Sequence, residues 1–388
     1  MNYSTRIFNY IDEVPNLVWE SLSIANNVYF SKGYLNAFEV NNSNRIQFFY
    51  FVVYSKEQPI SIAVIQVLEF DFFQVDFTSN ANAFVQKASS WLGRLMKRDY
   101  VKIMICGNVF LSGEHGIYIK PKEDKKLVIE ELIKGVQAII NANKYLEKWV
   151  DIILLKDFIT KSLPIANNLK TYNYSPVQVD SNMVLTLDSA WKNFDDYLSS
   201  FKSKYRVKAK KAYKTSEGLI VKDFTSEDIK THKRELANLY YNVKNKSSFN
   251  PETLNIATYI SLKEVMGNDF LLCGYFLEGK LVGFMSGVIN KTSLDAHYVG
   301  IDYELNKQNA IYSRMLYDYV RIGIERKLEY INFGRTSGEI KSTLGAVPEE
   351  LTCYVRHKKS VANFLFKPFL RKIKPAVFEQ RYPFKKVK

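Results

Sequence analysis

The sequence predicts an α/β fold with two domains, and three observations support this prediction. The chain has 388 residues, which is long enough for two domains of roughly 150 residues each. Hydrophobic residues make up 47% of the chain and aromatic residues 14%, which is enough for packed cores. In each half, patterns typical of β-strands alternate with patterns of amphipathic helices, in a shared order of hairpin, helix and strand.

The first half is predicted to form one α/β domain over residues 1–175. Its strand runs are rich in β-branched and aromatic residues and are bounded by turn residues, as at 55–59. Its helical runs place apolar residues at every third or fourth position. The predicted elements are a hairpin over 45–73, a helix over 82–99, a buried strand over 100–106, a helix over 124–146 and a buried strand over 148–158.

The second half is predicted to form another α/β domain over residues 176–357, followed by a basic and aromatic tail over 358–388. One helix is expected to end at Gly218, and the next to begin at Ser226, whose hydroxyl can cap a helix. The predicted elements are helices over 187–218, 226–246 and 309–327 and strands over 219–224, 270–279, 280–290, 293–305 and 330–334.

The formal net charge is +14, which indicates an anionic partner. Part of this charge is concentrated in residues 201–214, FKSKYRVKAKKAYK, which contain seven Lys and Arg residues and no acid. Nucleic acid, a phosphorylated carrier and anionic lipid all fit such a stretch. No glycine-aromatic or zinc-finger pattern accompanies it, so dedicated DNA or RNA binding is not expected.

The three cysteines, Cys106, Cys273 and Cys353, lie far apart and form no Cys-x-x-Cys pair, which argues against disulfides and metal sites. The N-terminal residues lack the continuous apolar core of a signal peptide. No apolar run approaches the roughly 18 residues that span a bilayer. The sequence therefore predicts a cytoplasmic protein, either free or peripherally bound to the inner leaflet of the membrane.

Three ordered stretches resemble the GNAT acyltransferase superfamily, and more narrowly its two-domain branch with the Fem-type aminoacyl transferases and related bacterial acetyltransferases. They are a Ser-Lys-x-Arg segment with a basic helix and a strand (198–224), a helix before a strand that closes in Phe-Gly (307–336), and a lysine shortly before a glycine (338–346). The resemblance covers about residues 190–360. It implies two GNAT-like domains, each a mixed, largely antiparallel sheet flanked by helices.

The resemblance implies an N-acyltransferase that moves an acyl or aminoacyl group from a carrier to an amine of a cell-envelope precursor or lipid. The alternative carriers are acyl-CoA, acyl-carrier protein and aminoacyl-tRNA. Acyl-CoA (acetyl-CoA or longer) is slightly favoured as co-substrate, because the coiled-coil arm of some Fem-type enzymes is absent. The usual pyrophosphate loop is replaced by ELNKQNAIYSRM at residues 304–315, so the standard mode of acetyl-CoA binding is not expected in this half.

Acyl transfer to an amine requires a general base, stabilisation of the carbonyl oxygen and a proton for the leaving group. The stretch SLDAHYVG offers His297, with an intrinsic pKa of about 6.5, together with Asp295 and Tyr298. In a regular strand, Asp295 and His297 lie on one face and Tyr298 on the other. The alternative is a hydrogen-bonded histidine without a catalytic role.

A second candidate acid/base pair is Glu114 and His115, in the stretch CGNVFLSGEHG. Gly107, Gly113 and Gly116 permit tight turns or the close approach of a ligand. Loops at strand ends are a common location of function in α/β proteins. The alternative is a glycine-rich connection that only turns a corner.

The resemblance also implies a basic cleft lined by the helix within 201–214 and by the loop after YINFG, where cations can neutralise phosphate or carboxylate. Surface charge without a specific partner is the alternative. The candidate residues for binding substrate or cofactor are Lys204, Arg206, Lys210, Asn309, Tyr312, Arg335 and Lys341.

The tail interleaves aromatic and basic residues, which is typical of a peripheral anchor on anionic lipid. A terminal segment docked on the body of the protein is the alternative. Two other functions stay open. One is a non-catalytic GNAT-fold protein that binds RNA or a phosphorylated ligand through its basic cleft, and the other is a structural protein of the membrane surface.

Overall fold

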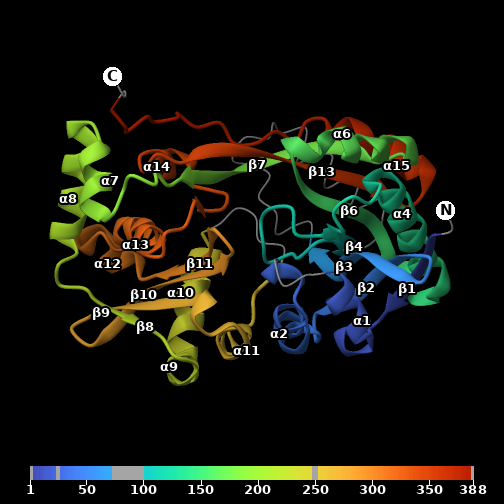
Figure 1. Cartoon of the computed structure of the whole chain (residues 1–388), viewed down its shortest axis with the longest axis horizontal. Coiled ribbons are helices and arrows are strands. Elements are labelled where there is room, and N and C mark those ends of the chain that lie inside the picture. The colour runs from blue at the N-terminus through green and yellow to red at the C-terminus, as the bar shows by residue number, and fades with distance from the viewer. Residues whose placement is uncertain (1–2, 23–26, 72–99, 247–251, 386–388) are drawn as a thin grey trace. The chain divides into compact units, whose positions relative to one another are not determined.

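The computed structural model describes residues 3–22, 27–71, 100–246 and 252–385. The chain divides into two compact units, each a sheet with helices, as the predicted α/β class requires (Figure 1). Unit 1 comprises Met1–Asp180, Ser248–Leu254 and Glu350–Pro375, and unit 2 comprises Ser181–Ser247, Asn255–Glu349 and Ala376–Lys388. The helix predicted over 82–99 lies outside the described residues.

The strands of unit 1 are β1 Tyr3–Phe8, β2 Ile46–Ser55, β3 Gln58–Asp71, β4 Tyr100–Cys106, β5 Ile117–Ile119, β6 Val150–Ile159 and β13 Val347–His357. They lie in the order β1-β2-β3-β4-β6-β13, and β5 also pairs with β3. Among the strand pairs that the structure describes in this order, β4 and β6 pair in parallel and the others antiparallel. The predicted hairpin is confirmed, because Lys56 and Glu57 join β2 to β3 with φ of 48° and 63°, as a tight hairpin turn requires.

The helices of unit 1 include α1 Asn16–Ser21, α2 Lys32–Asn42, α4 Lys125–Ala142, α5 Lys144–Trp149, α6 Leu163–Ala166 and α15 Ser360–Leu370. Gly135 of α4 lies against the ring of Phe51 in β2, whereas Glu39 of α2 lies beside the neighbouring Tyr50. Consecutive residues of a strand face opposite sides of the sheet. The helices α2 and α4 therefore cover opposite faces, and the sheet between them carries the core of this unit.

The strands of unit 2 are β7 Ser175–Thr186, β8 Ile220–Asp223, β9 Phe270–Leu277, β10 Lys280–Asn290, β11 Ser293–Ile301 and β12 Tyr330–Asn332. They lie in the order β7-β12-β11-β10-β9-β8, with β11 and β12 as the parallel pair. The remaining neighbours pair antiparallel. The largely antiparallel sheet expected from the sequence is thus present in this unit.

The helices of unit 2 are α7 Phe194–Ser200, α8 Ser203–Thr215, α9 Ser226–Thr231, α10 Lys233–Lys244, α11 Ala257–Met266, α12 Tyr303–Asn309, α13 Ile311–Glu325 and α14 Gly338–Ser342. Gly283 of β10 faces Met315 of α13, while the next residue, Phe284, has its ring beside Tyr259 of α11. Helices α13 and α11 therefore cover opposite faces of the sheet. Helix α8 packs on α13.

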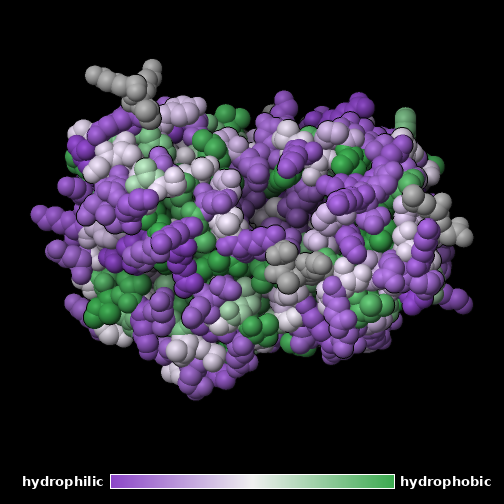
Figure 2. Space-filling view, in the orientation of Figure 1, coloured by the Kyte–Doolittle hydropathy of each residue, from purple (hydrophilic) through white to green (hydrophobic). Residues whose placement is uncertain are grey.

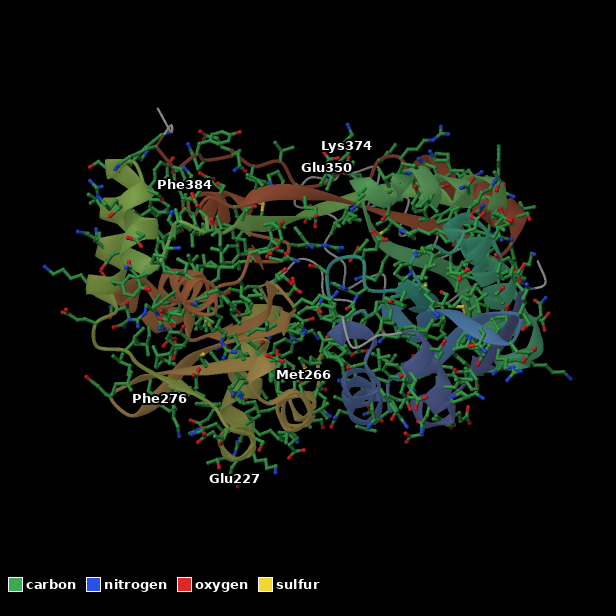
Figure 3. The ribbon with its side chains drawn as sticks, viewed as in Figure 1. Glu227, Met266, Phe276, Glu350, Lys374 and Phe384 are labelled. Atoms are coloured by element: carbon green, nitrogen blue, oxygen red, sulfur yellow. The ribbon has the colours of Figure 1, made fainter. Side chains whose placement is uncertain are left out.

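The helix predicted over 187–218 is in fact two helices, α7 and α8. Phe201 between them is extended and forms a β-bridge with Phe384, which is labelled in Figure 3. The end of the tail is therefore docked on unit 2, and Phe378 likewise packs over Gly338. For this part of the tail the structure agrees with the alternative of a docked terminal segment, in which Phe378 and Phe384 are half-buried against the core of unit 2. In the described parts of the chain, no helix is both long and apolar enough to cross a membrane.

The helix predicted over 226–246 is also divided, into α9 and α10, at His232. Thr225, and not Ser226, caps α9. Its hydroxyl accepts a hydrogen bond from the amide of Asp228, whose carboxylate accepts one from the amide of Thr225. Such a reciprocal pair satisfies two amides that a helix start leaves without partners.

Candidate active site

A β-bulge interrupts β11 in the middle of the unit 2 sheet. Met285 of β10 pairs with Val299 and Gly287 pairs with Ala296, so that Ser286 alone lies opposite two residues, His297 and Tyr298. A bulge of this kind leaves backbone groups outside the regular ladder and turns side chains to new directions. Bulges are frequent next to active sites for that reason.

Ser286 supplies the hydrogen bonds that the bulge removes from the ladder. Its Oγ donates to the carbonyl oxygen of Tyr298 at 2.9 Å and accepts from the amide of Tyr298 at 3.1 Å. Ser286 is fully buried, and its own carbonyl accepts a hydrogen bond from Tyr319 of α13. The sequence interpretation missed this serine, although a small hydroxyl residue within the apolar run LVGFMSGVI was the available signal.

The bulge changes how the predicted catalytic residues face. The rings of His297 and Tyr298 lie 4.4 Å apart between centroids, which the strict alternation expected for this stretch would prevent. Asp295 precedes the bulge and pairs with Val288 on one side and Asn332 on the other. The structure therefore brings His297 and Tyr298 together, because the extra residue breaks the alternation.

Tyr259 of α11 completes this cluster. Its hydroxyl lies 3.0 Å from Ser286 Oγ and 3.3 Å from His297 Nδ1. Tyr259 is fully buried, and burial raises its pKa well above the ordinary value of a tyrosine. Its phenol is therefore protonated at neutral pH and can donate a hydrogen bond. We call Tyr259, Ser286, His297 and Tyr298 the bulge cluster.

The other predicted pair, Glu114 and His115, lies in a loop of unit 1. The half-buried ring of His115 packs on Tyr29 at 4.0 Å between centroids. Burial, and secondly the charge of Lys156, lower the pKa of His115 to about 4, so it is neutral at pH 7. Glu114 accepts a hydrogen bond from the amide of Ile159, and burial raises the pKa of its carboxyl.

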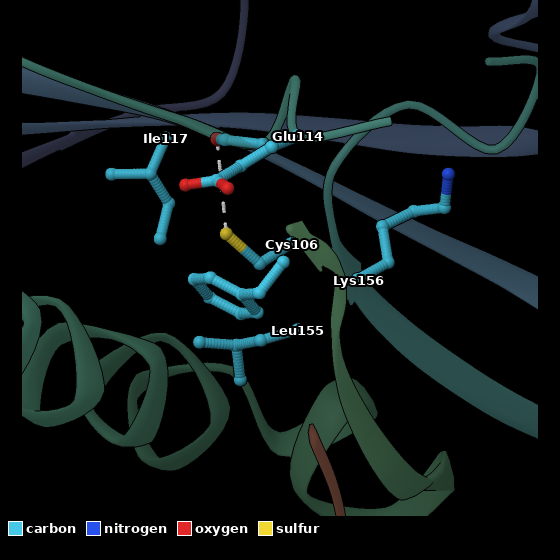
Figure 4. Close-up of a pocket in the computed structure, with 7 residues that line it drawn as sticks. Cys106, Glu114, Ile117, Leu155 and Lys156 are labelled. Atoms are coloured by element: carbon cyan, nitrogen blue, oxygen red, sulfur yellow. Dashed lines mark hydrogen bonds between the residues drawn. The ribbon is translucent and has the colours of Figure 1, made fainter. Parts of the chain in front are cut away.

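Glu114 lines a cavity of about 10 Å³ (Figure 4). Such a volume has room for about one water molecule and not for a substrate. Cys106 lines part of the cavity, and its thiol donates a hydrogen bond to the carbonyl oxygen of Gly116. The residues that line it are Cys106, Glu114, Gly116, Ile117, Leu155, Lys156 and Phe158.

A buried ion pair anchors this loop, and the sequence interpretation missed it. Lys156 Nζ lies 2.7 Å from the carboxylate of Asp157, which is fully buried and has a φ of +66°. Lys156 also donates to the carbonyl of Asn108, and Asp157 accepts from the amide of Gly113. The thiol of Cys353 donates to the other oxygen of Asp157. The charged pair in the buried run LLKDF was the available signal.

The basic helix α8 does not lie beside the bulge cluster. Lys204 and Lys210 are exposed and Arg206 is half-buried, while Ala209 and Ala212 form the buried face. Helix α8 packs on α13, whereas Tyr259 lies on the opposite face of the sheet. The outer surface over α8 is largely hydrophilic (Figure 2). The predicted basic cleft therefore does not combine α8 with His297.

Asn309 and Tyr312 lie where α12 meets α13. The side chain of Asn309 donates to the carbonyl of Leu305, and the amide of Tyr312 donates to the side chain of Asn306. The buried hydroxyl of Tyr312 bonds to Ser337. These contacts hold the start of α13 and connect it to the loop after β12.

Lys341 is buried and not exposed at a cleft as expected. It is 4% exposed, and its Nζ donates to the carbonyl oxygens of Phe333, Gly334 and Arg335 at 2.7, 3.2 and 2.6 Å. Burial lowers the pKa of Lys341 to about 7, whereas three carbonyl acceptors favour the ammonium form. Its three donors are used within the fold, because the loop that contains the half-buried Arg335 needs partners for its carbonyls.

The fold and the sheet distortion define a GNAT-like protein of two units, and comparisons with known proteins agree. The chain belongs to the FemAB-like family, described as peptidoglycan biosynthesis/recognition, whose model matches residues 113–386. Membership of this family confirms the predicted resemblance and the class of N-acyltransferases. No curated protein sequence matches the chain significantly.

Three solved structures share the fold. A structure of FemX is 13% identical with a TM-score of 0.53, over 85% of this chain and 92% of that chain. A tandem GNAT protein from the clavulanic acid biosynthesis pathway is 8% identical with a TM-score of 0.55, over 92% and 98%. L-PGS from Bacillus licheniformis is 12% identical with a TM-score of 0.52, over 93% and 98%. At these identities the likeness shows the fold alone, and it confirms the predicted GNAT-like architecture.

Proposed function

We propose that the chain transfers an acyl or aminoacyl group from a carrier to an amine of a cell-envelope precursor or lipid, at the bulge cluster of unit 2. The observation that carries this proposal is the bulge itself. It brings an imidazole and a phenol to 4.4 Å from each other on a distorted strand whose backbone is fixed by Ser286. Groups held in this way need little reorganisation during a reaction.

The chemistry follows from the groups present. The amine nitrogen attacks the carbonyl carbon of the donor, a C–N bond forms, and the bond from this carbon to the carrier sulfur or oxygen breaks. His297 takes the proton that the amine loses, and Tyr298 supplies a proton to the leaving group. The amide of Tyr298 is bonded to Ser286, so the carbonyl oxygen must be stabilised by another donor.

The donor is proposed to be acyl-CoA, with its phosphates held near the start of α13 by the helix amides, since residues 304–315 lack the usual pyrophosphate loop. The amides at a helix start attract anions. At α13 a neutral side chain, Asn306, bonds to the amide of Tyr312, whereas at α4 of unit 1 the carboxylate of Asp124 occupies this place. A carboxylate at this place would repel the phosphates of the donor. The start of α13 therefore suits a phosphorylated donor better than the start of α4. Acyl-carrier protein and aminoacyl-tRNA are the alternative donors.

The experiment is a transfer assay with a defined amine acceptor and four donors: acetyl-CoA, long-chain acyl-CoA, acyl-carrier protein and aminoacyl-tRNA. The proposal expects transfer from at least one donor, with acyl-CoA the best. It also expects His297→Ala to abolish most of the transfer while the circular dichroism spectrum is unchanged. Lack of transfer from all four donors would contradict the proposal.

A second candidate function is non-catalytic binding of RNA or a phosphorylated ligand. The exposed lysines of α8, a helix without any acidic residue, favour it. Such binding would depend steeply on salt, because each neutralised phosphate releases counterions. Salt-dependent binding of oligonucleotide without turnover, lost on replacing Lys204 and Lys210 by Gln, would favour this function over catalysis.

We also propose that α15 of unit 1 binds an anionic membrane surface. This helix has two apolar faces, because Phe366 and Leu370 pack inward while Val361 and Phe364 are 75% and 74% exposed. At 100° per residue the outward face lies opposite the inward one. Residues 351–378 contain seven Lys and Arg residues and no acid, which suits anionic lipid.

Vesicle sedimentation tests this surface. The protein is expected to sediment with vesicles of phosphatidylcholine and phosphatidylglycerol, not with phosphatidylcholine alone, and Val361→Ser with Phe364→Ser should abolish the binding. Val207→Ser, on the exposed surface of α8, is the matched control and should bind as before. Dimerisation through the same face, lost in the double variant without any vesicle binding, would contradict the proposal.

A further inference from the structure

We infer that Tyr259 and Ser286 are positioning residues that fix the tautomer of His297, with the proton on Nδ1 and the basic nitrogen at Nε2. This inference rests on the proposed role of His297 for its catalytic meaning, but it can be tested without activity. It follows from the direction of a chain of hydrogen bonds through α11, β10 and β11.

The direction of the hydrogen-bond chain is set by a group that can only accept a hydrogen bond. The carbonyl oxygen of Tyr298 lies 2.9 Å from Ser286 Oγ, so the single proton of Ser286 must point to it. Ser286 Oγ then accepts from the amide of Tyr298 at 3.1 Å, and its remaining lone pair accepts at 3.0 Å from Tyr259. Ser286 is thereby saturated.

The proton of Tyr259 is committed in turn. Because its hydroxyl donates to Ser286, its oxygen can only accept in the 3.3 Å contact with His297 Nδ1. Nδ1 must therefore carry a proton. A neutral imidazole has one N–H, so Nε2 is the nitrogen with the lone pair.

Burial makes this arrangement strict. Tyr259 and Ser286 are both 0% exposed. If the hydrogen bonds ran in the opposite direction, the hydroxyl proton of Ser286 would point away from the carbonyl of Tyr298. This carbonyl would then lose its hydrogen bond from Ser286, which is unfavourable. The protein thus selects one tautomer through the hydrogen bonds of Ser286 and Tyr259.

The consequence for the reaction is a defined proton path. The proton from the attacking amine goes to Nε2, and the resulting imidazolium keeps its Nδ1–H bond to the oxygen of Tyr259. The imidazole then returns the proton from Nε2 to solvent, while Tyr298 protonates the leaving group. No proton needs to move along the chain, since Tyr259 and Ser286 only hold the ring.

Nitrogen-15 NMR of histidine-labelled protein tests the inference directly, because the chain has only four histidines. The spectrum is taken at about pH 8.5, where an imidazole of ordinary pKa is neutral, and His297→Ala assigns the signals. We expect Nδ1 of His297 to show a protonated nitrogen and Nε2 an unprotonated one. A protonated Nε2 with a bare Nδ1 would overturn the inference whatever the activity.

Tyr259→Phe should shift His297 towards a mixture of tautomers and lower kcat about 10- to 100-fold with little change in KM, since the base is held in the wrong form for part of the time. Tyr319→Phe is the matched control: it removes another buried tyrosine hydroxyl, bonded to the carbonyl of Ser286 and not to Oγ. This control should leave the tautomer unchanged. An unchanged tautomer in Tyr259→Phe would overturn the inference, whereas a confirmed tautomer with full activity in His297→Ala would contradict only the proposed function.

Discussion

Both units interrupt a strand at the same place in their sheets, but they do so by different means. In each unit the fourth strand of an antiparallel run, β4 or β11, is interrupted before a long helix, α4 or α13. In unit 2 a single extra residue in β11 makes the interruption. In unit 1 the chain leaves β3 after Gly107 and returns to it at Gly116. Each interruption carries a histidine, His297 or His115.

The groups that hold the two interruptions differ in chemistry. Hydroxyl groups hold the bulge of unit 2, where Tyr259 contacts both Ser286 and His297. A buried ion pair, Lys156 with Asp157, holds the loop of unit 1, and its lysine helps to keep His115 uncharged. The same fold position thus carries the proposed general base in unit 2 and a histidine packed on Tyr29 in unit 1.

The largest expected effect separates the two histidines. His297→Ala should lower the rate of acyl transfer by roughly 10²–10⁴-fold, the usual contribution of a general base. His115→Ala should leave the rate within about 3-fold, because the neighbouring cavity has no room for a substrate. Initial rates at saturating donor measure both. Equal losses in the two variants would show that the unit 1 loop takes part in the reaction.

The second effect concerns the ion pair of unit 1. Asp157→Asn should lower the free energy of unfolding by about 3–5 kcal/mol, because Lys156 would keep a buried charge without its partner. Urea denaturation measures the change. Lys222→Gln, which breaks an exposed pair with Asp228, is the control and should cost less than about 1 kcal/mol.

A smaller effect compares the helices behind the two interruptions. A Cβ at Gly135 of α4 would lie 1.6 Å from the ring of Phe51, while at Gly323 of α13 it would lie 2.8 Å from Ile331. Gly135→Ala should therefore cost about 1–3 kcal/mol and Gly323→Ala less. Thermal unfolding of both variants gives the order. The reverse order would show that α4 moves away from the sheet more easily than α13.

The smallest expected effect is a dependence of stability on pH. Burial lowers the pKa of His115 in the folded protein from 6.5 to about 4, so below pH 6.5 the unfolded chain binds a proton that the folded chain does not. The contribution of His115 to stability should therefore fall as the pH decreases from 6.5 to about 4. Denaturant titrations across this range, compared with His115→Gln, measure it. An identical pH profile in the variant would contradict the prediction.

Much of the fold could be predicted from the sequence because its signals are local. Alternating and β-branched runs gave the hairpin of β2 and β3 and the three strands β9, β10 and β11. The break between α7 and α8 depends on a β-bridge from Phe201 to Phe384. These two residues lie nearly two hundred positions apart, so no local pattern in the sequence indicates the bridge. Long-range pairing therefore explains where helix prediction failed.

The candidate site was predictable only in part for the same reason. His297 was identified from its residue type, but the bulge arises from the pairing of two strands, and Tyr259 comes from a separate helix. Lys341 was misplaced because a lysine near a glycine in a sequence does not reveal the three carbonyls around it. Sequence patterns indicate which groups are present, whereas partners follow from tertiary structure.

The docked end of the chain has a consequence for synthesis on the ribosome. Phe384 fills a space between Trp191, Phe201 and Gly345, so residues near the C-terminus complete a core begun about two hundred residues earlier. Unit 2 cannot finish its packing until Phe384 has left the ribosome. Until then, Trp191 and Phe201 of the nascent chain lack their packing partner Phe384. Their exposed rings would offer a binding site for a chaperone.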